Sequence, residues 1–161
     1  ILNDNDIRFA LFAKVALDTL KRLYWKPDII VCNDWQMSFI PQLLKENYSD
    51  DEFYSNMKTV SLIHSVNDYR FFSKKAYDAI NLDYTAKDDT VDNYLSLLKF
   101  SDKVVLIDDE NNMLSEEIKS DKDLNSIYKK SNNSQLVMST DASTSDWMKL
   151  INEFDSILNK V

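Results

Sequence analysis

The apolar run IIVC at residues 29–32 is the feature that most limits how this chain can fold. A run without polar alternation predicts a strand covered on both faces, as the strands of parallel sheets are. Pro27 stands just before this run and ends the helical pattern of the preceding residues. Residues 58–64 and 103–107 are predicted as the next two strands. The expected fold class is therefore α/β, with a parallel sheet flanked by helices.

The segments between these strands carry apolar residues at three- and four-residue spacing, which is typical of helices that pack on a sheet. The first helix is expected over residues 7–24, with Phe12 on its inward face, and the second over residues 35–46, where Pro41 would kink it. A long loop is expected over residues 65–89, with a short helix at 73–80, and a helix capped by Thr90 follows it. Short helices are expected at 113–120 and 124–130, then a strand at 135–138 and a final helix capped by Ser145. No repeat or linker interrupts the chain, so residues 1–161 are expected to form a single domain.

The chain has no glycine in 161 residues, although average usage of about 7% would give roughly eleven. No glycine-rich loop can therefore cradle a phosphate within this segment. Left-handed backbone positions must fall to other residues, and Asn47 and Asn81 are the candidates. One cysteine and one histidine exclude a disulfide framework and a Cys/His metal cluster, so neither a metal nor a cofactor is expected.

A net charge of -8 argues against binding to nucleic acid or to anionic membranes, since both need clustered lysine and arginine. No apolar run approaches the ~20 residues of a membrane span, and the start lacks the layout of a signal peptide, so a cytoplasmic protein is expected. The chain opens at Ile1 without a methionine, which suggests that it begins inside a longer parent. A missing strand and helix would leave apolar surface uncovered, so the isolated chain is expected to self-associate or to need a partner.

Polar residues at the ends of the first two predicted strands form the candidate site. Asp34 and Trp35 follow the first strand, and His64 ends the second. Ligands of open α/β sheets bind outside the carboxyl ends of the strands, and neighbouring strands lie about 4.8 Å apart, so Asp34 and His64 are expected within roughly 10 Å of each other. A structural alternative stays open, in which Asp34 only caps the following helix, Trp35 only fills the core and His64 is a hydrogen-bonding residue at a strand end.

Five short segments, in this order and spacing, resemble the amino-terminal domain of bacterial glycogen synthases and plant starch synthases. They are residues 6–12 (DIRFALF), 25–30 (WKPDII), 33–36 (NDWQ), 58–60 (KTV) and His64. The resemblance implies a Rossmann-like domain that forms one half of a GT-B glycosyltransferase. The present chain would be the carboxyl-terminal part of that amino-terminal domain.

The family consists of retaining glucosyltransferases that extend α-1,4-glucan from ADP-glucose. The resemblance implies that Asp34 and His64 are catalytic residues beside the transferred glucose. It also implies that Asp34, Trp35, His64 and Tyr69 bind substrate at the interdomain cleft. The implied partners are an α-1,4-glucan or maltooligosaccharide, and a second glycosyltransferase domain or chain.

Two hypotheses about activity stay open, because the chain departs from the family pattern. The family's lysine and paired glycines that hold the nucleotide phosphates would lie upstream of Ile1. The third predicted strand ends in Asp108, Asp109 and Glu110, where the family commonly has serine and proline, and this negative charge would repel a diphosphate. The chain is therefore either one part of a glucosyltransferase completed by other segments, or a non-catalytic relative that binds glucan or a synthase partner and has lost the nucleotide site.

We predict that the isolated chain transfers no glucose. Glucosyl transfer needs oriented N–H groups or cations that stabilise the leaving diphosphate, and this segment offers neither a glycine loop nor a basic cluster. The measurement is incorporation of labelled glucose from ADP-glucose into glycogen by the purified chain. Incorporation above the enzyme-free background would contradict the prediction.

Overall fold

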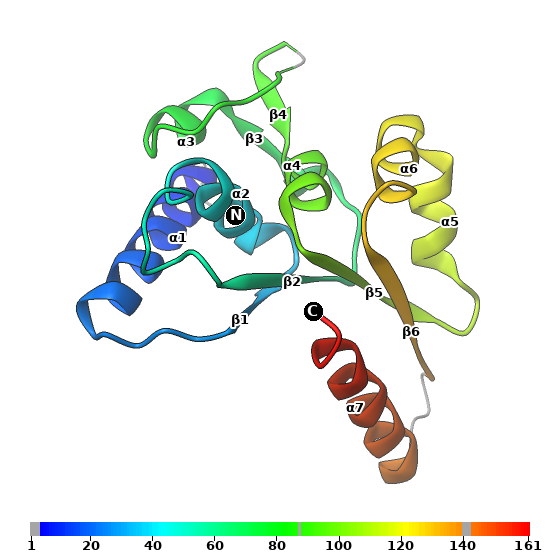
Figure 1. The fold of residues 1–161 in the computed structure, drawn as a ribbon. Helices are drawn as coiled ribbons and strands as arrows, with labels where there is room; N and C mark the ends of the chain where they lie inside the picture. The colour runs from blue at the N-terminus through cyan, green and yellow to red at the C-terminus, as the bar shows by residue number, and fades with distance from the viewer. Residues whose placement is uncertain (1–3, 87, 140–142) are drawn as a thin grey trace.

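The computed structural model describes residues 4–86, 88–139 and 143–161. Its centre is a four-stranded parallel sheet in which each strand lies beside the one before it, in the order β1-β2-β5-β6 (Figure 1). The strands are β1 (Ile29–Asn33), β2 (Lys58–Ile63), β5 (Lys103–Asp109) and β6 (Asn133–Met138). The predicted α/β class and parallel sheet are confirmed.

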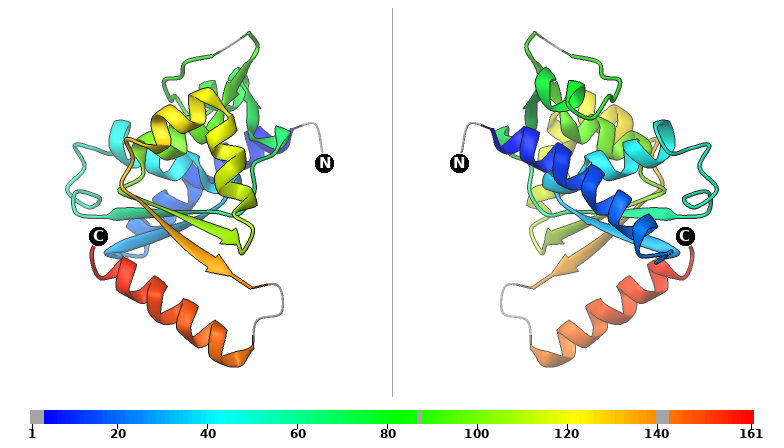
Figure 2. Two further views of the ribbon diagram at one scale, coloured as in Figure 1. Left: turned by 90° about the vertical axis from the view of Figure 1, so that its right-hand side faces the viewer. Right: turned by 90° about the vertical axis from the view of Figure 1, so that its left-hand side faces the viewer.

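The described helices cover the two faces of this sheet very unequally (Figure 2). One face carries α1 (Asn5–Arg22), α2 (Phe39–Glu46), α4 (Asn93–Phe100), α5 (Met113–Ser120) and α6 (Lys122–Tyr128), and α3 (Lys74–Asp78) packs outside them against α1. The other face is covered by α7 alone (Thr144–Leu158). The chain therefore has a thick helical layer on one side of the sheet and a single helix on the other.

Alternation along β5 explains both layers, because successive side chains of a strand point to opposite faces. Val104 and Leu106 belong to the large core under the helical layer. Val105 lies on the opposite face with Val60 and Leu136, and Phe154 of α7 packs against that group. The apolar runs thus lack polar alternation because both sheet faces are covered.

The region around Pro41 differs from the expected helix over residues 35–46. A 3₁₀ turn occupies Trp35–Met37, and α2 begins only at Phe39. Pro41 is thus the third residue of α2, where its missing N–H would have no partner within the helix. The predicted kink is therefore wrong.

Both predicted helix caps are also wrong. Thr90 lies in β4 (Thr90–Asp92), which pairs antiparallel with β3 (Phe71–Ser73) in a small hairpin that the sequence pattern did not predict. Asp92 caps α4 instead, because its side chain accepts from the Tyr94 N–H at 3.1 Å. The cap of α7 is Ser143 rather than Ser145, in a reciprocal capping box with Asp146.

Residues other than glycine occupy the left-handed backbone positions. Asn81 does so with φ 55°, as predicted, but Asn47 is right-handed with φ -86°. Tyr24, Asp34 and Asn112 also have positive φ, at 53°, 57° and 57°. Such a conformation costs about 1–2 kcal/mol at a residue that carries a Cβ, and Asn tolerates it best.

The first helix shows a narrower buried face than predicted. Ala10, Ala13 and Leu17 are fully buried, whereas Phe12 is exposed together with Leu11 and Val15. The small residues on its buried face let α1 pack closely against α2 and α3. The larger apolar residues on the adjacent face of α1 therefore stay exposed to solvent. This exposed stripe of α1 is an apolar patch on the surface of the isolated chain.

We predict that the isolated chain self-associates through this stripe of α1. Phe12→Lys places a charge in the patch and should weaken association at least tenfold, because a buried charge without a partner is costly. Sedimentation equilibrium over a wide concentration range measures this. Asn111→Lys, at an exposed position outside α1, is the matched control and should change nothing. A wild-type chain that stays monomeric at all concentrations would exclude the idea.

Candidate functional site

The structure brings Asp34 and His64 together at the carboxyl edge of the sheet. β1 and β2 are adjacent and parallel, and Asn33 is level with Leu62. His64 Nδ1 lies 3.1 Å from Asp34 Oδ2, and His64 Nε2 lies 2.8 Å from Asn33 Oδ1. The predicted proximity of Asp34 and His64 is therefore confirmed.

Asp34 is held by its backbone in an unusual way. Its φ of 57° and ψ of -169° fall in a region occupied almost only by glycine, at a cost of about 1–3 kcal/mol. Its N–H donates to the Leu62 carbonyl at 2.8 Å and so continues the ladder between β1 and β2. Its side chain makes no hydrogen bond to the following turn, so the alternative that Asp34 is only a helix cap is wrong.

The Asp34 carboxylate instead contacts polar side chains from other segments of the chain. Only 5% of the residue is exposed. Ser65 Oγ donates to Oδ2 at 3.0 Å, and the Tyr94 hydroxyl contacts Oδ1. The same carboxylate lies 3.1 Å from His64 Nδ1, so Asp34 helps to hold the orientation of the His64 ring, whose side chain is 38% exposed.

Tyr94 is a site residue that the sequence pattern missed. Its position on the inward face of α4 predicted only a core role, but its buried hydroxyl reaches both the Asp34 carboxylate and the Ser65 carbonyl. Burial, and then the charge of Asp34, raise the pKa of Tyr94 well above its ordinary value, so the phenol stays a neutral donor. The available signal was the hydroxyl itself, because a buried tyrosine hydroxyl usually finds a partner.

Trp35 and Tyr69 form an aromatic pair in which one ring is buried and the other is exposed. Trp35 is 9% exposed, and its ring meets Phe9 and Phe72 edge to face at centroid distances of 5.5 and 5.9 Å. Tyr69 lies over Trp35 at 6.1 Å with 55% of its surface exposed. The Asn67 side chain accepts from the Tyr69 N–H at 3.0 Å and fixes this turn. Of the two rings, solvent reaches mainly Tyr69.

A cavity of about 440 Å³ opens beside His64, at the carboxyl ends of β2, β5 and β6. His64, Ser65 and the acidic pair Asp108 and Asp109 contribute to its wall. No lysine or arginine is among the described residues that line it. The edge predicted as the site is thus hollow, negatively charged and next to the exposed side of His64.

Asp108 has a structural task at this edge. Its carboxylate accepts from the N–H groups of Leu114 and Ser115, at 3.0 and 2.9 Å, in the first turn of α5. Burial alone would raise the pKa of Asp108, but these hydrogen bonds and one from the Ser115 hydroxyl outweigh it and hold the pKa below the ordinary range. Asp108 therefore stays ionised and stabilises the start of α5.

The described residues contain neither a cluster of metal ligands nor a membrane-spanning helix. No group of three or more His, Cys, Asp or Glu side chains is arranged to hold a metal ion. In the same part of the chain, no helix is long and apolar enough to cross a bilayer.

Comparison with known proteins identifies the family. The sequence model of the starch synthase catalytic domain matches residues 2–125. The chain belongs to this family. A glycogen synthase of Clostridium perfringens is 54% identical over 63 residues, which are 39% of this chain and 13% of that protein. One of Geotalea daltonii is 44% identical over 80 residues, or 50% of this chain and 16% of that protein.

A solved structure supports the fold of this starch synthase family member. The catalytic domain of starch synthase IV from Arabidopsis thaliana, bound to ADP and acarbose, superimposes with a TM-score of 0.71 over 85% of this chain and 30% of that chain, at 22% identity. The expected half of a GT-B fold is thereby confirmed. The chain spans only 13% to 16% of the two glycogen synthases, so it corresponds to a small part of such proteins.

We predict that Tyr94→Phe lowers the free energy of unfolding by about 2 kcal/mol, because a hydrogen bond to a buried charged group is worth ~1.5–3 kcal/mol. Urea denaturation measures this. Tyr48→Phe is the matched control, since its hydroxyl also donates to a carboxylate, Asp18 at 2.9 Å, but in a partly exposed pair. We expect the control to cost less than about 1 kcal/mol. Equal losses in both variants would contradict the role of Tyr94 as a support of Asp34.

Proposed function

We propose that this chain forms the sugar side of a glucosyltransferase cleft that transfers glucose from ADP-glucose to α-1,4-glucan. A second glycosyltransferase domain or chain, or other segments of a longer protein, would supply the groups that hold the nucleotide. The observation that carries the proposal is the His64 ring, which Asp34 holds at 3.1 Å beside a cavity at the carboxyl edge of the sheet. Family membership and the ADP and acarbose in the fold neighbour support the same reading.

The geometry supports a different role for each of the predicted residues. Asp34 is nearly buried and its carboxylate is shared by three neighbours, so it is a positioning residue that acts through His64. The His64 side chain is 38% exposed, and a sugar hydroxyl would replace Asn33 Oδ1, now 2.8 Å away, as the partner of His64 Nε2. Tyr69 offers the exposed aromatic face on which the apolar side of a sugar can lie, while Trp35 supports it from below.

Strain at Asp34 favours a functional role for this arrangement. A backbone region that costs about 1–3 kcal/mol persists only where the surroundings over-determine it, and such outliers cluster at functional sites. Here the cost holds a carboxylate against the imidazole rather than against the next helix turn.

A second candidate function is glucan binding without catalysis. The acidic lining of the cavity beside His64 favours it, because Asp108, Asp109 and Glu117 would repel the diphosphate of a donor. Both candidates require contact with sugar. They differ in the sequence upstream of Ile1: a Lys-x-Gly-Gly turn after a strand would favour the glucosyltransferase, and its absence would favour the binding protein.

We predict that the chain binds maltoheptaose weakly, with a Kd of about 1 mM, and shows no detectable binding of ADP. His64→Ala and Tyr69→Ala should weaken sugar binding at least fivefold, and Asp34→Asn should weaken it by disturbing the His64 ring. NMR titration measures all of these. Trp35→Ala should also lose binding, but it removes a core ring, so its spectrum must first show a folded chain.

Tyr24→Ala is the control for this titration, because Tyr24 is an exposed tyrosine that does not line the cavity beside His64. It should bind maltoheptaose as the wild type does. A flat wild-type titration, or equal affinities for wild type, His64→Ala and Tyr69→Ala, would leave these residues with structural roles only.

A further inference from the structure

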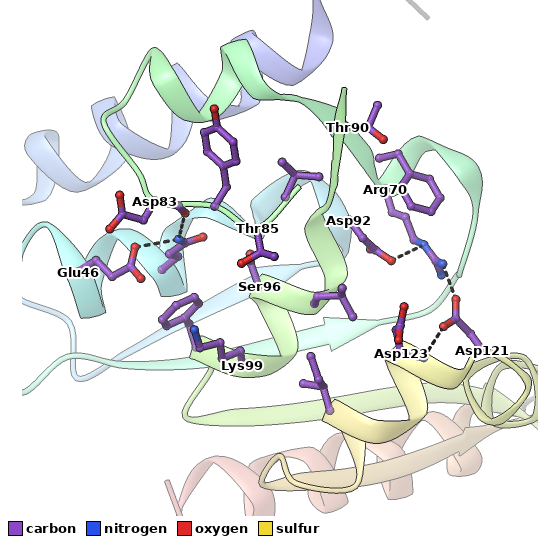
Figure 3. Close-up of a pocket in the computed structure, with 17 residues that line it drawn as sticks. Glu46, Arg70, Asp83, Thr85, Thr90, Asp92, Ser96, Lys99, Asp121 and Asp123 are labelled. Carbon is purple, nitrogen blue, oxygen red and sulfur yellow. Dashed lines mark hydrogen bonds and ion pairs between the residues drawn. The ribbon is translucent and has the colours of Figure 1, made fainter. Parts of the chain in front are cut away.

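Arg70 is nearly buried at the end of the turn that carries Tyr69. Both residues belong to the 3₁₀ turn Asp68–Arg70, and Arg70 is only 8% exposed. Figure 3 shows its guanidinium group between the carboxylates of Asp92 and Asp121. Arg70 Nε lies 3.3 Å from Asp92 Oδ2, and Arg70 Nη2 lies 2.6 Å from Asp121 Oδ2. The side chain therefore joins the Tyr69 turn to two other elements of the fold.

Both carboxylates that pair with Arg70 are also helix caps. Asp92 Oδ1 accepts from the Tyr94 N–H at 3.1 Å, at the start of α4. Asp121 Oδ1 accepts from two N–H groups in the first turn of α6, at 3.0 and 3.1 Å. Each carboxylate thus uses one oxygen for its helix and the other for Arg70. The guanidinium group is therefore fixed to the amino ends of two helices.

The other end of the turn is tied to the Asp34 site. Asn67 Oδ1 accepts from the Tyr69 N–H at 3.0 Å, and Asn67 Nδ2 donates to Ser65 Oγ at 3.1 Å. Ser65 Oγ in turn donates to Asp34 Oδ2 at 3.0 Å. The Arg70 N–H closes the turn on the Asn67 carbonyl at 3.2 Å. Tyr69 thus lies between two anchors, one at Asp34 and one at Arg70.

These anchors matter because the Tyr69 ring is largely open to solvent. It is 55% exposed and lies over Trp35 at a centroid distance of 6.1 Å. A loosely held ring would lose conformational entropy on meeting a ligand, and preorganisation reduces that loss. A buried ion pair adds little net stability, because desolvation offsets the attraction, whereas the planar fork of arginine favours one geometry. The two ion pairs of Arg70 are therefore better suited to fixing the turn than to stabilising the fold.

We propose that Arg70 is a positioning residue for sugar binding, which holds the Tyr69 ring over Trp35. This inference rests on the proposed sugar-binding function of this edge of the sheet. Arg70 acts through Tyr69 and does not itself contact the sugar. Without its two ion pairs, Tyr69 should move away from Trp35, while the His64 ring should keep its place beside Asp34.

The first measurement needs no sugar. NMR of the wild-type chain should show nuclear Overhauser contacts between the ring protons of Tyr69 and Trp35. Arg70→Gln removes both the charge and the fork, so these contacts should be lost. Arg22→Gln makes the same substitution at the exposed end of α1 and should keep them. Contacts that are absent in the wild type, or unchanged in Arg70→Gln, would overturn the proposal.

A double-mutant cycle with maltoheptaose separates the positioning of Tyr69 from a general loss of structure. Arg70→Gln should weaken binding at least threefold in the wild-type chain and in the His64→Ala background. In the Tyr69→Ala background it should change the affinity by less than twofold, because the ring that it positions is gone. An equal loss in all three backgrounds would overturn the proposal, since it would show a structural effect alone.

Asp121→Asn tests the same contact if Arg70→Gln does not fold. The asparagine keeps an oxygen that can cap α6 but removes the negative charge that faces Arg70, so the contacts between Tyr69 and Trp35 should weaken. Unchanged contacts in a folded Asp121→Asn chain would again overturn the proposal.

The two proposals fail in different ways. Sugar binding by the wild type that Arg70→Gln leaves unchanged would overturn the role of Arg70 and leave the proposed function standing. A flat wild-type titration would overturn the proposed function and the part of Arg70 in sugar binding. The ring contacts would then decide whether Arg70 positions Tyr69 at all.

Discussion

The hydrogen-bonded ladder between β1 and β2 is the interaction on which the candidate site depends. Its register puts Asn33 level with Leu62, so the residues that leave the two strands emerge at one edge of the sheet. The Asp34 N–H extends the ladder by one more bond to Leu62. That bond fixes the backbone of Asp34 in a strained conformation and turns its carboxylate toward the strand-end histidine.

Much of the fold follows from simple sequence patterns. Unalternated apolar runs predicted the parallel strands, because strands covered on both faces have no polar side. The meeting of Asp34 with His64 followed from the same reasoning, since the carboxyl ends of neighbouring parallel strands share an edge. These inferences needed only two facts: side chains alternate between the two faces of a strand, and strands joined by a helical crossover run parallel.

Other features depend on contacts that no local pattern contains. The three-residue strands β3 and β4 are too short to show a periodicity and exist because they pair with each other. Ser143 and Ser145 are equally good capping residues in sequence, and the structure selects the one whose partner is an acidic residue three positions later. Tyr94 was recognisable as an inward residue of α4, but the carboxylate that its hydroxyl meets comes from a distant part of the chain.

Because the two faces of the sheet are covered unequally, local unfolding is expected to begin with α7. α7 has no fully buried residue, and it alone shields Val60, Val105 and Leu136 on its face of the sheet. Elements with few buried contacts have the lowest free energy of local unfolding. Amide hydrogens of α7 should accordingly exchange with solvent before those of β2 and β5, and each such opening would briefly present a flat apolar sheet surface to any neighbouring chain. The fold therefore carries an aggregation hazard on the side that a single helix protects, in addition to the exposed stripe of α1.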